Sequence, residues 1–176
     1  GAGYIVLQSE KLLRKEPYCL LSGYSNVNEA FHQTGSSPEG NGPFWSMTEA
    51  IAKSEIPPEE IDYINVHGTG TPSNDLSEGL AIRRIFGDKI PPFSSVKAFI
   101  GHTLGASEGI EAVYSVLSVY HGFIYPNLNF KEPIEENMLM PETSFREGLP
   151  IRNVLSNSFG FGGNDSSILF STLKEK

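Results

Sequence analysis

The 176-residue sequence predicts an α/β fold in which a mixed, mostly parallel sheet carries helices on both faces. Three observations favour this fold class. Short apolar runs, rich in β-branched and aromatic residues, alternate along the chain with longer segments of helical periodicity. Glycine, proline and asparagine separate the two kinds of segment. Hydrophobic residues make up 39% of the chain, which is enough for a domain of this length to bury a core.

The first quarter of the chain predicts two strands and a helix. Glycines at the start lead directly into an apolar strand pattern over residues 4–7. We therefore expect the chain to begin inside a structural element, at a cut rather than at a natural start. Residues 18–24 predict the next strand, and residues 26–43 form a loop rich in Gly, Ser, Pro and Asn. A helix is expected over residues 44–54.

The next segments repeat the strand and helix pattern. Proline favours the first turn of a helix, so residues 57–60 predict a short helical turn. A strand follows at residues 63–66. Asn74 or Asp75 can then cap a helix that runs to Phe86, and the glycine after it ends that helix.

A third strand and a long helix follow. The strand is expected at residues 92–95, and residues 96–102 form a loop. The helix is expected over residues 103–120 and ends before Gly122. Its apolar residues surround most of the helix, so we expect it to be buried on most sides. Three polar residues interrupt that surface: Glu111, Ser115 and Ser118.

The C-terminal part predicts two strands after a long irregular stretch. Residues 125–150 are rich in proline and show no periodicity. Strands are expected at residues 154–157 and 166–171, with a glycine-rich turn at residues 159–163 between them. From residue 18 onward, the predicted order is therefore βαβαβαββ.

Three unusual segments follow predicted strands. His67 follows the strand at 63–66, Lys97 and His102 follow the strand at 92–95, and the glycine-rich turn follows the strand at 154–157. Sites in such sheets lie beyond the carboxyl ends of the strands, so we expect these residues to converge. Neutral histidines that donate from a ring nitrogen, with a lysine that fixes their protonation, suit a site that handles negative charge on a carboxylate or an enolate. The alternative is that each of them is a structural or surface residue.

Composition excludes several classes of function. The net charge of −8 and the absence of any Lys/Arg run longer than Arg83–Arg84 disfavour nucleic-acid binding. No apolar segment approaches the roughly 18 residues of a membrane span. The single cysteine, Cys19, excludes an internal disulfide and is compatible with a reducing cytoplasm. It lies in an apolar strand pattern, so we interpret it as a core residue and not as a nucleophile.

The motifs together resemble those of a known family, the elongating β-ketoacyl-[acyl-carrier-protein] synthases. The matching segments are His67-Gly68-Thr69-Gly70-Thr71-Pro72 with Asp75 and Glu78, Ser95-Val96-Lys97, Gly101-His102-Thr103-Leu104-Gly105-Ala106, and Asn157-Ser158-Phe159-Gly160-Phe161-Gly162-Gly163. Shorter likenesses at residues 1–3, 31–34 and 38–40 extend the resemblance over nearly the whole chain. It implies a thiolase-like fold of two similar halves. Residues 1–17 would then end the N-terminal half, and residues 18–176 would form the C-terminal ketosynthase domain.

The resemblance also implies an activity. In this family a cysteine of the N-terminal half accepts an acyl chain from acyl carrier protein, malonyl-carrier protein is decarboxylated, and the resulting carbanion attacks the thioester. This decarboxylating Claisen condensation needs no bound cofactor, because the substrate is carried on the phosphopantetheine of acyl carrier protein. The resemblance implies a homodimer, and a chain without its N-terminal half would be inactive alone.

Motif positions imply roles for individual residues. His67 and His102 would polarise the malonyl thioester carbonyl, and Lys97 would orient its partners electrostatically. Glu111 lies in an apolar helix and is expected to pair with Lys97, although backbone or water partners are an alternative. These four residues are the predicted catalytic set, and no metal is expected.

A second set is implied for substrate binding. Thr69 and Thr71 match threonines that bind the phosphopantetheine arm, although they could merely stabilise a turn. Phe161 matches a phenylalanine that gates the acyl pocket, and the glycines beside it, including Gly162 and Gly163, would let it move.

Three departures from the family pattern qualify the resemblance. Asn164-Asp165 stands where Thr-Asn is common, which changes the charge behind the gate. Glu108 stands where a small residue is usual. No cysteine of this chain lies in the small-residue turn that exposes a nucleophile.

Two other classes of function remain as alternatives. One is a non-catalytic ketosynthase-like partner subunit of the chain-length-factor type, against which the retention of His67, Lys97 and His102 argues. The other is a metal-binding module built on His32, His67 and His102, which lacks close ligand spacing.

Overall fold

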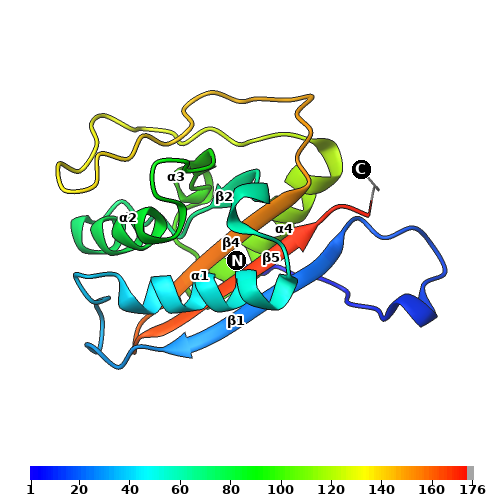
Figure 1. Ribbon diagram of the computed structural model, residues 1–176, viewed down its shortest axis with the longest axis horizontal. Coiled ribbons are helices and arrows are strands. Elements are labelled where there is room, and N and C mark those ends of the chain that lie inside the picture. Colours follow the sequence, from blue (N-terminus) through cyan, green and yellow to red (C-terminus); the bar gives the residue numbers. More distant parts are fainter. Residues whose placement is uncertain (174–176) are drawn as a thin grey trace.

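The computed structural model describes residues 1–173 and contains one five-stranded sheet, in the order β1-β5-β4-β2-β3 (Figure 1). The strands are β1 (Leu20–Asn28), β2 (Tyr63–Asn65), β3 (Phe93–Ser94), β4 (Asn153–Gly160) and β5 (Asn164–Ser171). β2 pairs in parallel with both β3 and β4, whereas β5 pairs antiparallel with β4 and β1. Four strands therefore point in one direction and β5 in the other, which confirms a mixed sheet, with two parallel and two antiparallel pairings.

The helices follow the predicted order. They are α1 (Asn41–Ser54), α2 (Pro72–Phe86), α3 (Lys97–Ile100) and α4 (Ser107–His121), with the short 3-10 helices η1 (Glu10–Leu12), η2 (Pro58–Glu60) and η3 (Leu104–Ala106). The order βαβαβαββ is thus confirmed. The glycine that follows α2 and the one that follows α4 have positive φ angles, as expected for residues that end helices.

The two faces of the sheet carry separate hydrophobic clusters. α1 and α2 pack on one face, where Met47, Ile64 and Ile82 are fully or almost fully buried. α4 packs on the other face, against a cluster that includes Tyr63 and Phe170. Figure 1 shows α1 in front of the sheet and α4 behind it. Helices therefore cover both faces, as predicted.

The N-terminal elements correct the sequence prediction. Residues 4–7 form no strand and are exposed, because no strand within residues 1–173 pairs with them. β1 extends four residues beyond the predicted end at Tyr24, because its pairing with β5 continues to Asn28. α1 begins at Asn41 and not at Phe44.

Helix starts also differ from the sequence prediction. α2 begins at Pro72, with Thr71 at the N-cap position, so neither Asn74 nor Asp75 caps it. The expected loop at 96–102 contains the four-residue helix α3. α4 begins at Ser107, because the preceding residues form the 3-10 helix η3. Backbone hydrogen bonds mark two of these starts, since Asp75 N–H donates to Thr71 O at 3.0 Å and Ala106 N–H donates to Thr103 O at 3.2 Å.

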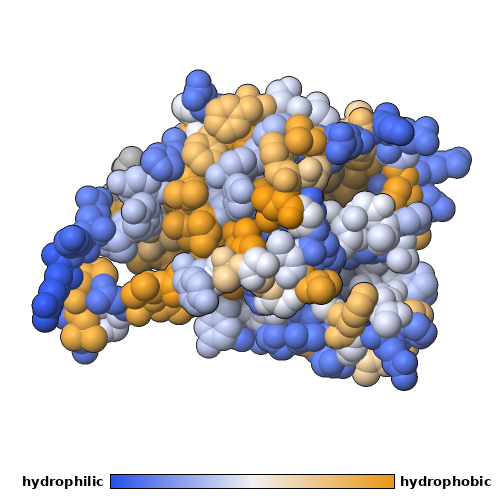
Figure 2. Space-filling view, turned by 180° about the vertical axis from the view of Figure 1, so that it is seen from behind, coloured by the Kyte–Doolittle hydropathy of each residue, from blue (hydrophilic) through white to orange (hydrophobic). Residues whose placement is uncertain are grey.

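α4 is not buried on most sides. Its polar residues Glu111, Ser115 and Ser118 are buried, whereas Val113 and Leu117 are only half-buried. The inward side carries these polar residues beside the apolar Ala112 and Val119. Asn65 of β2 donates hydrogen bonds to the Glu111 carbonyl and to Ser115 Oγ, at 3.0 and 3.1 Å. Small hydroxyl side chains let the helix approach the sheet closely. Figure 2 shows apolar side chains gathered on this rear face.

Cys19 is half-buried and packs against the hydrophobic cluster beneath α4. It lies immediately before β1 rather than within it. Burial raises the pKa of its thiol to about 11, so the thiolate is disfavoured at neutral pH. The expectation of an unreactive cysteine is consistent with this environment, although the side chain is less buried than a core residue.

Candidate active site

The centre of the site is His67, which lies two residues after the end of β2 at Asn65. β2, β3 and β4 are parallel, so their carboxyl ends lie at one edge of the sheet. The His67 side chain is 3% exposed, and its ring lies 5.2 Å from the His102 ring and 5.6 Å from the Phe159 ring, measured between centroids. The convergence of the strand ends predicted from the sequence is therefore present.

Lys97, the first residue of α3, connects His67 to α4. Its Nζ lies 3.1 Å from His67 Nδ1 and forms an ion pair with Glu111 Oε1. Ser107 Oγ donates a second hydrogen bond to the same carboxylate oxygen at 3.0 Å. The Lys97–Glu111 pair expected from the sequence is present, and it is buried. A buried pair needs such additional hydrogen bonds to offset the loss of hydration.

These contacts determine the protonation of both histidines. Burial, the Lys97 charge and His102 lower the pKa of His67 to about 2, so its ring is neutral at physiological pH. An ammonium group has no acceptor, so Nδ1 of His67 accepts and Nε2 carries the proton. Burial and Lys97 also lower the pKa of His102. Its Nδ1 accepts the Leu104 N–H at 3.2 Å, which again leaves the proton on Nε2.

His102 differs from His67 in exposure. It lies in the turn between α3 and η3 and is exposed to solvent. Gly101 and Leu104, on either side of it, both have positive φ angles. The turn brings the His102 ring nearly perpendicular to the His67 ring, with an interplanar angle of 84°. The two rings therefore meet edge to face, one buried in the fold and the other exposed at its surface.

Glu78 is a site residue to which the sequence motif alone assigned no role. It is buried on α2, and its two carboxylate oxygens accept the backbone N–H groups of His67 and Gly68 at 3.0 and 2.9 Å. Asn157 Nδ2 of β4 donates to it at 3.1 Å. Burial raises the pKa of Glu78 to about 7, although these hydrogen bonds oppose the increase. Glu78 thus fixes the backbone that carries His67.

A cavity of about 550 Å³ opens beside the two histidines. Thr69, Thr71 and Phe161 line it together with His67 and His102. The two threonine hydroxyls lie 2.8 Å apart, and Thr71 is exposed whereas Thr69 is half-buried. The structure therefore brings together at one cavity the histidines and three of the five residues expected to bind substrate, whereas Gly162 and Gly163 do not line it.

Phe161 occupies the tip of the turn between β4 and β5 and is 76% exposed. Gly162 and Gly163, which follow it, have φ angles of 84° and 76°, a region that favours glycine. The turn is attached to the segment after β1, because Gly162 N donates to Gln33 O at 2.8 Å. The strand β4 extends to Gly160, so the glycines that adopt unusual backbone angles lie only on the C-terminal side of Phe161.

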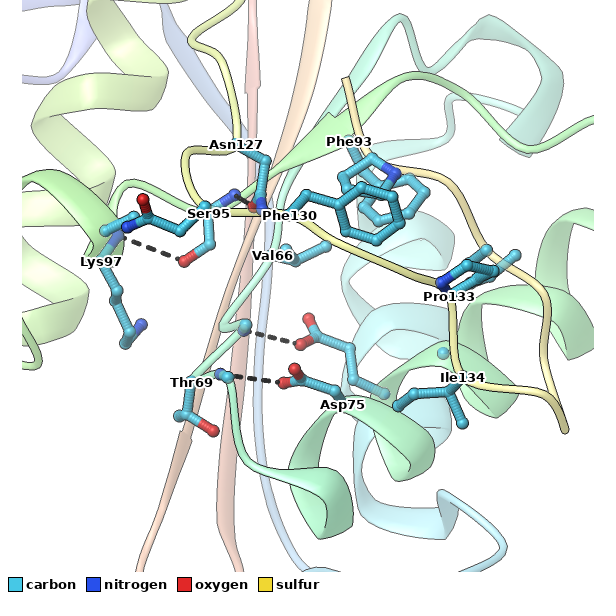
Figure 3. Close-up of a pocket in the computed structure, with 18 of the residues that line it drawn as sticks. Val66, Thr69, Asp75, Phe93, Ser95, Lys97, Asn127, Phe130, Pro133 and Ile134 are labelled. Atoms are coloured by element: carbon cyan, nitrogen blue, oxygen red, sulfur yellow. Dashed lines mark hydrogen bonds between the residues drawn. The ribbon is translucent and has the colours of Figure 1, made fainter. Parts of the chain in front are cut away.

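A second cavity, of about 480 Å³, lies between the carboxyl ends of β2 and β3 and the irregular segment 127–141 (Figure 3). Thr69 and Lys97 line it, so it adjoins the site just described. Asn127 Oδ1 accepts the Ser95 N–H at 3.0 Å, which joins this segment to β3. The sequence showed no periodicity here, so this wall of the site could not be predicted.

Two other expectations concern a metal site that includes His32 and a membrane-spanning segment. His32 Nδ1 accepts the Thr34 N–H at 3.2 Å, and His32 does not line the cavity of His67 and His102. Within residues 1–173, no group of three or more His, Cys, Asp and Glu side chains is placed to hold a metal ion. No helix in the same range is long and apolar enough to cross a membrane.

Comparison with known proteins identifies the family. Residues 18–131 match the family described as "Beta-ketoacyl synthase, C-terminal domain". The match covers more than half of the chain, and the chain belongs to this family. The resemblance stated from the motifs is thereby confirmed.

Relatives with curated names agree with the match. The chain is 37% identical to the mitochondrial 3-oxoacyl-[acyl-carrier-protein] synthase of Arabidopsis thaliana, over 98% of this chain and 39% of that protein. It is 38% identical to 3-oxoacyl-[acyl-carrier-protein] synthase 1 of Escherichia coli K12, over 99% of this chain and 43% of that protein. The chain therefore spans about two fifths of the length of these relatives.

Solved structures confirm the thiolase-like ketosynthase fold. A ketosynthase in complex with its chain length factor from Xenorhabdus doucetiae has a TM-score of 0.80 and 35% identity, over 90% of this chain and 40% of that one. A type II polyketide ketosynthase in complex with its acyl-carrier protein has a TM-score of 0.83 and 30% identity, over 89% of this chain and 39% of that one.

Proposed function

We propose that this chain is the C-terminal part of a condensing enzyme that extends an acyl chain by decarboxylating Claisen condensation with malonyl-acyl carrier protein. The observation that supports this most directly is the pair of neutral histidines beside one cavity, each with Nδ1 occupied. Two Nε2–H donors suit one oxygen atom that gains negative charge. The substrate is carried on the phosphopantetheine of acyl carrier protein, and no other cofactor takes part.

The two donors would act during decarboxylation. The carboxylate of the malonyl group leaves as carbon dioxide, and its bonding electrons pass to the thioester as an enolate. Nε2–H groups of His67 and His102 donate hydrogen bonds to the enolate oxygen, which lowers the energy of this state. The carbanion then attacks the carbonyl carbon of an acyl thioester on a cysteine supplied by the part of the enzyme that this chain does not contain. A carbon–carbon bond forms, the acyl carbon–sulfur bond breaks, and the cysteine leaves as a thiolate. The chain alone is therefore inactive in condensation.

Lys97 and Glu111 are positioning residues in this proposal. The Lys97 ammonium next to His67 Nδ1 disfavours a second proton on the ring, so His67 keeps its proton on Nε2. Glu111 and Ser107 hold the ammonium at that position. Thr69 and Thr71 would bind the phosphopantetheine arm, and Phe161 would gate the acyl group.

The proposed partners follow from the names of the relatives and from the surface. Acyl carrier protein is named with a related ketosynthase, and relatives are carrier-protein synthases. The half-buried apolar side chains of α4 suit a surface that packs against the N-terminal half of the enzyme. Residues 1–17 would be the last residues of that half. We further propose a homodimer of the full-length enzyme in the cytoplasm.

Separate measurement of two half-reactions in the full-length enzyme tests the proposal. We expect His67→Ala and His102→Ala to lower condensation by at least about 10²-fold, because each removes a donor to the enolate. Acyl transfer to the cysteine, followed by mass spectrometry of the protein, should remain largely intact because it precedes enolate formation. Equal loss of acyl transfer in both variants would contradict these roles. A wild-type enzyme without any condensation would instead favour a non-catalytic partner subunit.

A further inference from the structure

Glu108 lines the same cavity as the two histidines and Phe161. It is the second residue of α4, in the first turn of that helix. Its side chain is half-buried, whereas the expected place for an unpaired glutamate is the solvent-facing side of a helix. A carboxyl group therefore forms part of the wall of the substrate cavity.

The helix start explains only part of this position. A glutamate in the first turn of a helix is favoured by the helix dipole even when its carboxylate points to water. Here burial raises the pKa of Glu108, and a hydrogen bond with the Ser166 side chain on β5 opposes the increase. Ser166 Oγ also accepts a hydrogen bond from Asn26 Nδ2 at 2.8 Å. The carboxyl group of this cavity-lining residue is thus held by a side chain of β5.

The rest of the wall combines polar and apolar side chains. Hydroxyl and amide side chains contribute to it from several segments, among them Thr34, Ser36, Ser158 and Asn164. Its apolar side chains are Leu104, Phe159 and Phe161. An alkyl chain placed against the carboxylate and the hydroxyl and amide groups would remove their water without offering hydrogen bonds, which is costly for a carboxylate above all.

We propose that Glu108 is a specificity-determining residue, and that this cavity favours acyl groups that bear a hydroxyl group over alkyl groups of equal length. This inference rests on the proposed condensing function. The substrate hydroxyl would donate to the Glu108 carboxylate and accept from a serine or threonine hydroxyl of the wall. A site that hydrogen-bonds a substrate hydroxyl discriminates strongly against the analogue that lacks it, because its own polar groups are then left unpaired.

The test uses the full-length enzyme and a panel of acyl-carrier-protein thioesters of equal chain length. One member is unsubstituted, and the others carry a single hydroxyl at successive carbons. For at least one hydroxyl position, we expect the wild-type kcat/KM ratio of hydroxylated to unsubstituted acyl group to fall about tenfold or more in Glu108→Ala. Glu108→Gln should give an intermediate ratio because it keeps an acceptor without the charge. Glu59→Ala, which removes an exposed first-turn glutamate of η2, is the control and should leave the ratio unchanged.

The possible outcomes separate this inference from the proposed function. Condensation with all acyl groups, at ratios that are equal in wild type and Glu108→Ala, would overturn the specificity role and leave the condensing function standing. Failure of the wild-type enzyme to condense any member of the panel would overturn the condensing function and this inference with it. Thermal unfolding of each variant identifies loss of folding. If Glu108→Ala does not fold, the kcat/KM ratio of Glu108→Gln is compared with that of the wild type instead.

Discussion

The site has two sides that differ in how they are held. The buried side contains His67, Lys97, Glu111 and Glu78, all at most 8% exposed. The open side contains His102, Thr71 and Phe161, which are exposed, and Thr69, which is half-buried. Side-chain hydrogen bonds and an ion pair within this chain fix the buried residues. The open residues have fewer partners, so their final positions depend more on what covers the cavity.

The largest expected effect comes from breaking the buried side at Glu111. Glu111→Gln leaves the Lys97 ammonium buried without an opposite charge, and we expect it to lower the free energy of unfolding by about 3–5 kcal/mol. Urea unfolding measures this change. Glu136→Gln, at an exposed glutamate, is the matched control and should change stability by less than about 0.5 kcal/mol. Similar values for the two variants would show that the buried pair does not hold the site.

Glu78 provides a smaller effect that depends on pH. Its pKa in the folded state is raised from 4.5 to about 7, so the folded protein binds this proton more tightly than the unfolded protein does. The resulting stability, about 3 kcal/mol, is fully present below pH 4.5 and is lost as pH rises to about 7. Glu78→Gln cannot titrate.

The difference in unfolding free energy between wild type and Glu78→Gln should therefore shift in favour of the variant as pH rises from 4.5 to about 7. Urea unfolding at several pH values measures the shift, and subtraction of the two curves cancels other titrating groups. A constant difference over this range would mean that Glu78 has no raised pKa. Its role would then be limited to the hydrogen bonds to His67 and Gly68.

The smallest effect is expected on the open side, at Phe161. Its side chain is largely exposed in a turn with two glycines of positive φ, so Phe161→Ala should leave folding stability nearly unchanged. In the full-length enzyme we expect entry of bulky acyl groups to accelerate about fivefold, which corresponds to roughly 1 kcal/mol of barrier. Stopped-flow acylation measures the rate. An unchanged rate would reduce Phe161 to ordinary packing.

The buried side was the more predictable of the two. The strand before His67 and the helix that carries Glu111 follow from local hydrophobic patterns, and parallel strands bring their carboxyl ends together. The inward polar side of α4 could not be predicted in this way. Its partner, Asn65, is 46 residues before Glu111 in the chain, and no local pattern contains that contact.

Residues 4–7 show that a local pattern can also mislead, because they have a strand pattern but no neighbouring strand in the described part of the chain.

The open side of the site could be predicted only as a set of motif residues. The exposure of His102 depends on two backbone angles that the sequence does not specify. The segment 127–141 forms a cavity wall through contacts such as that of Asn127 with Ser95, without any periodicity of its own.

The serines of α4 have a consequence for which substitutions the protein tolerates. Ser115 is fully buried beneath the helix, and its hydroxyl bonds the Glu111 carbonyl one turn earlier at 2.9 Å. A bulkier residue at position 115 would push the helix away from the sheet, because a packed interior has no space for added atoms. Glu111 would move with the helix, away from Lys97. Mutational scanning should therefore find that activity is sensitive to substitution of Ser115, although Ser115 does not line the cavity of the two histidines. The small size of its side chain allows Glu111 to lie close enough to pair with Lys97.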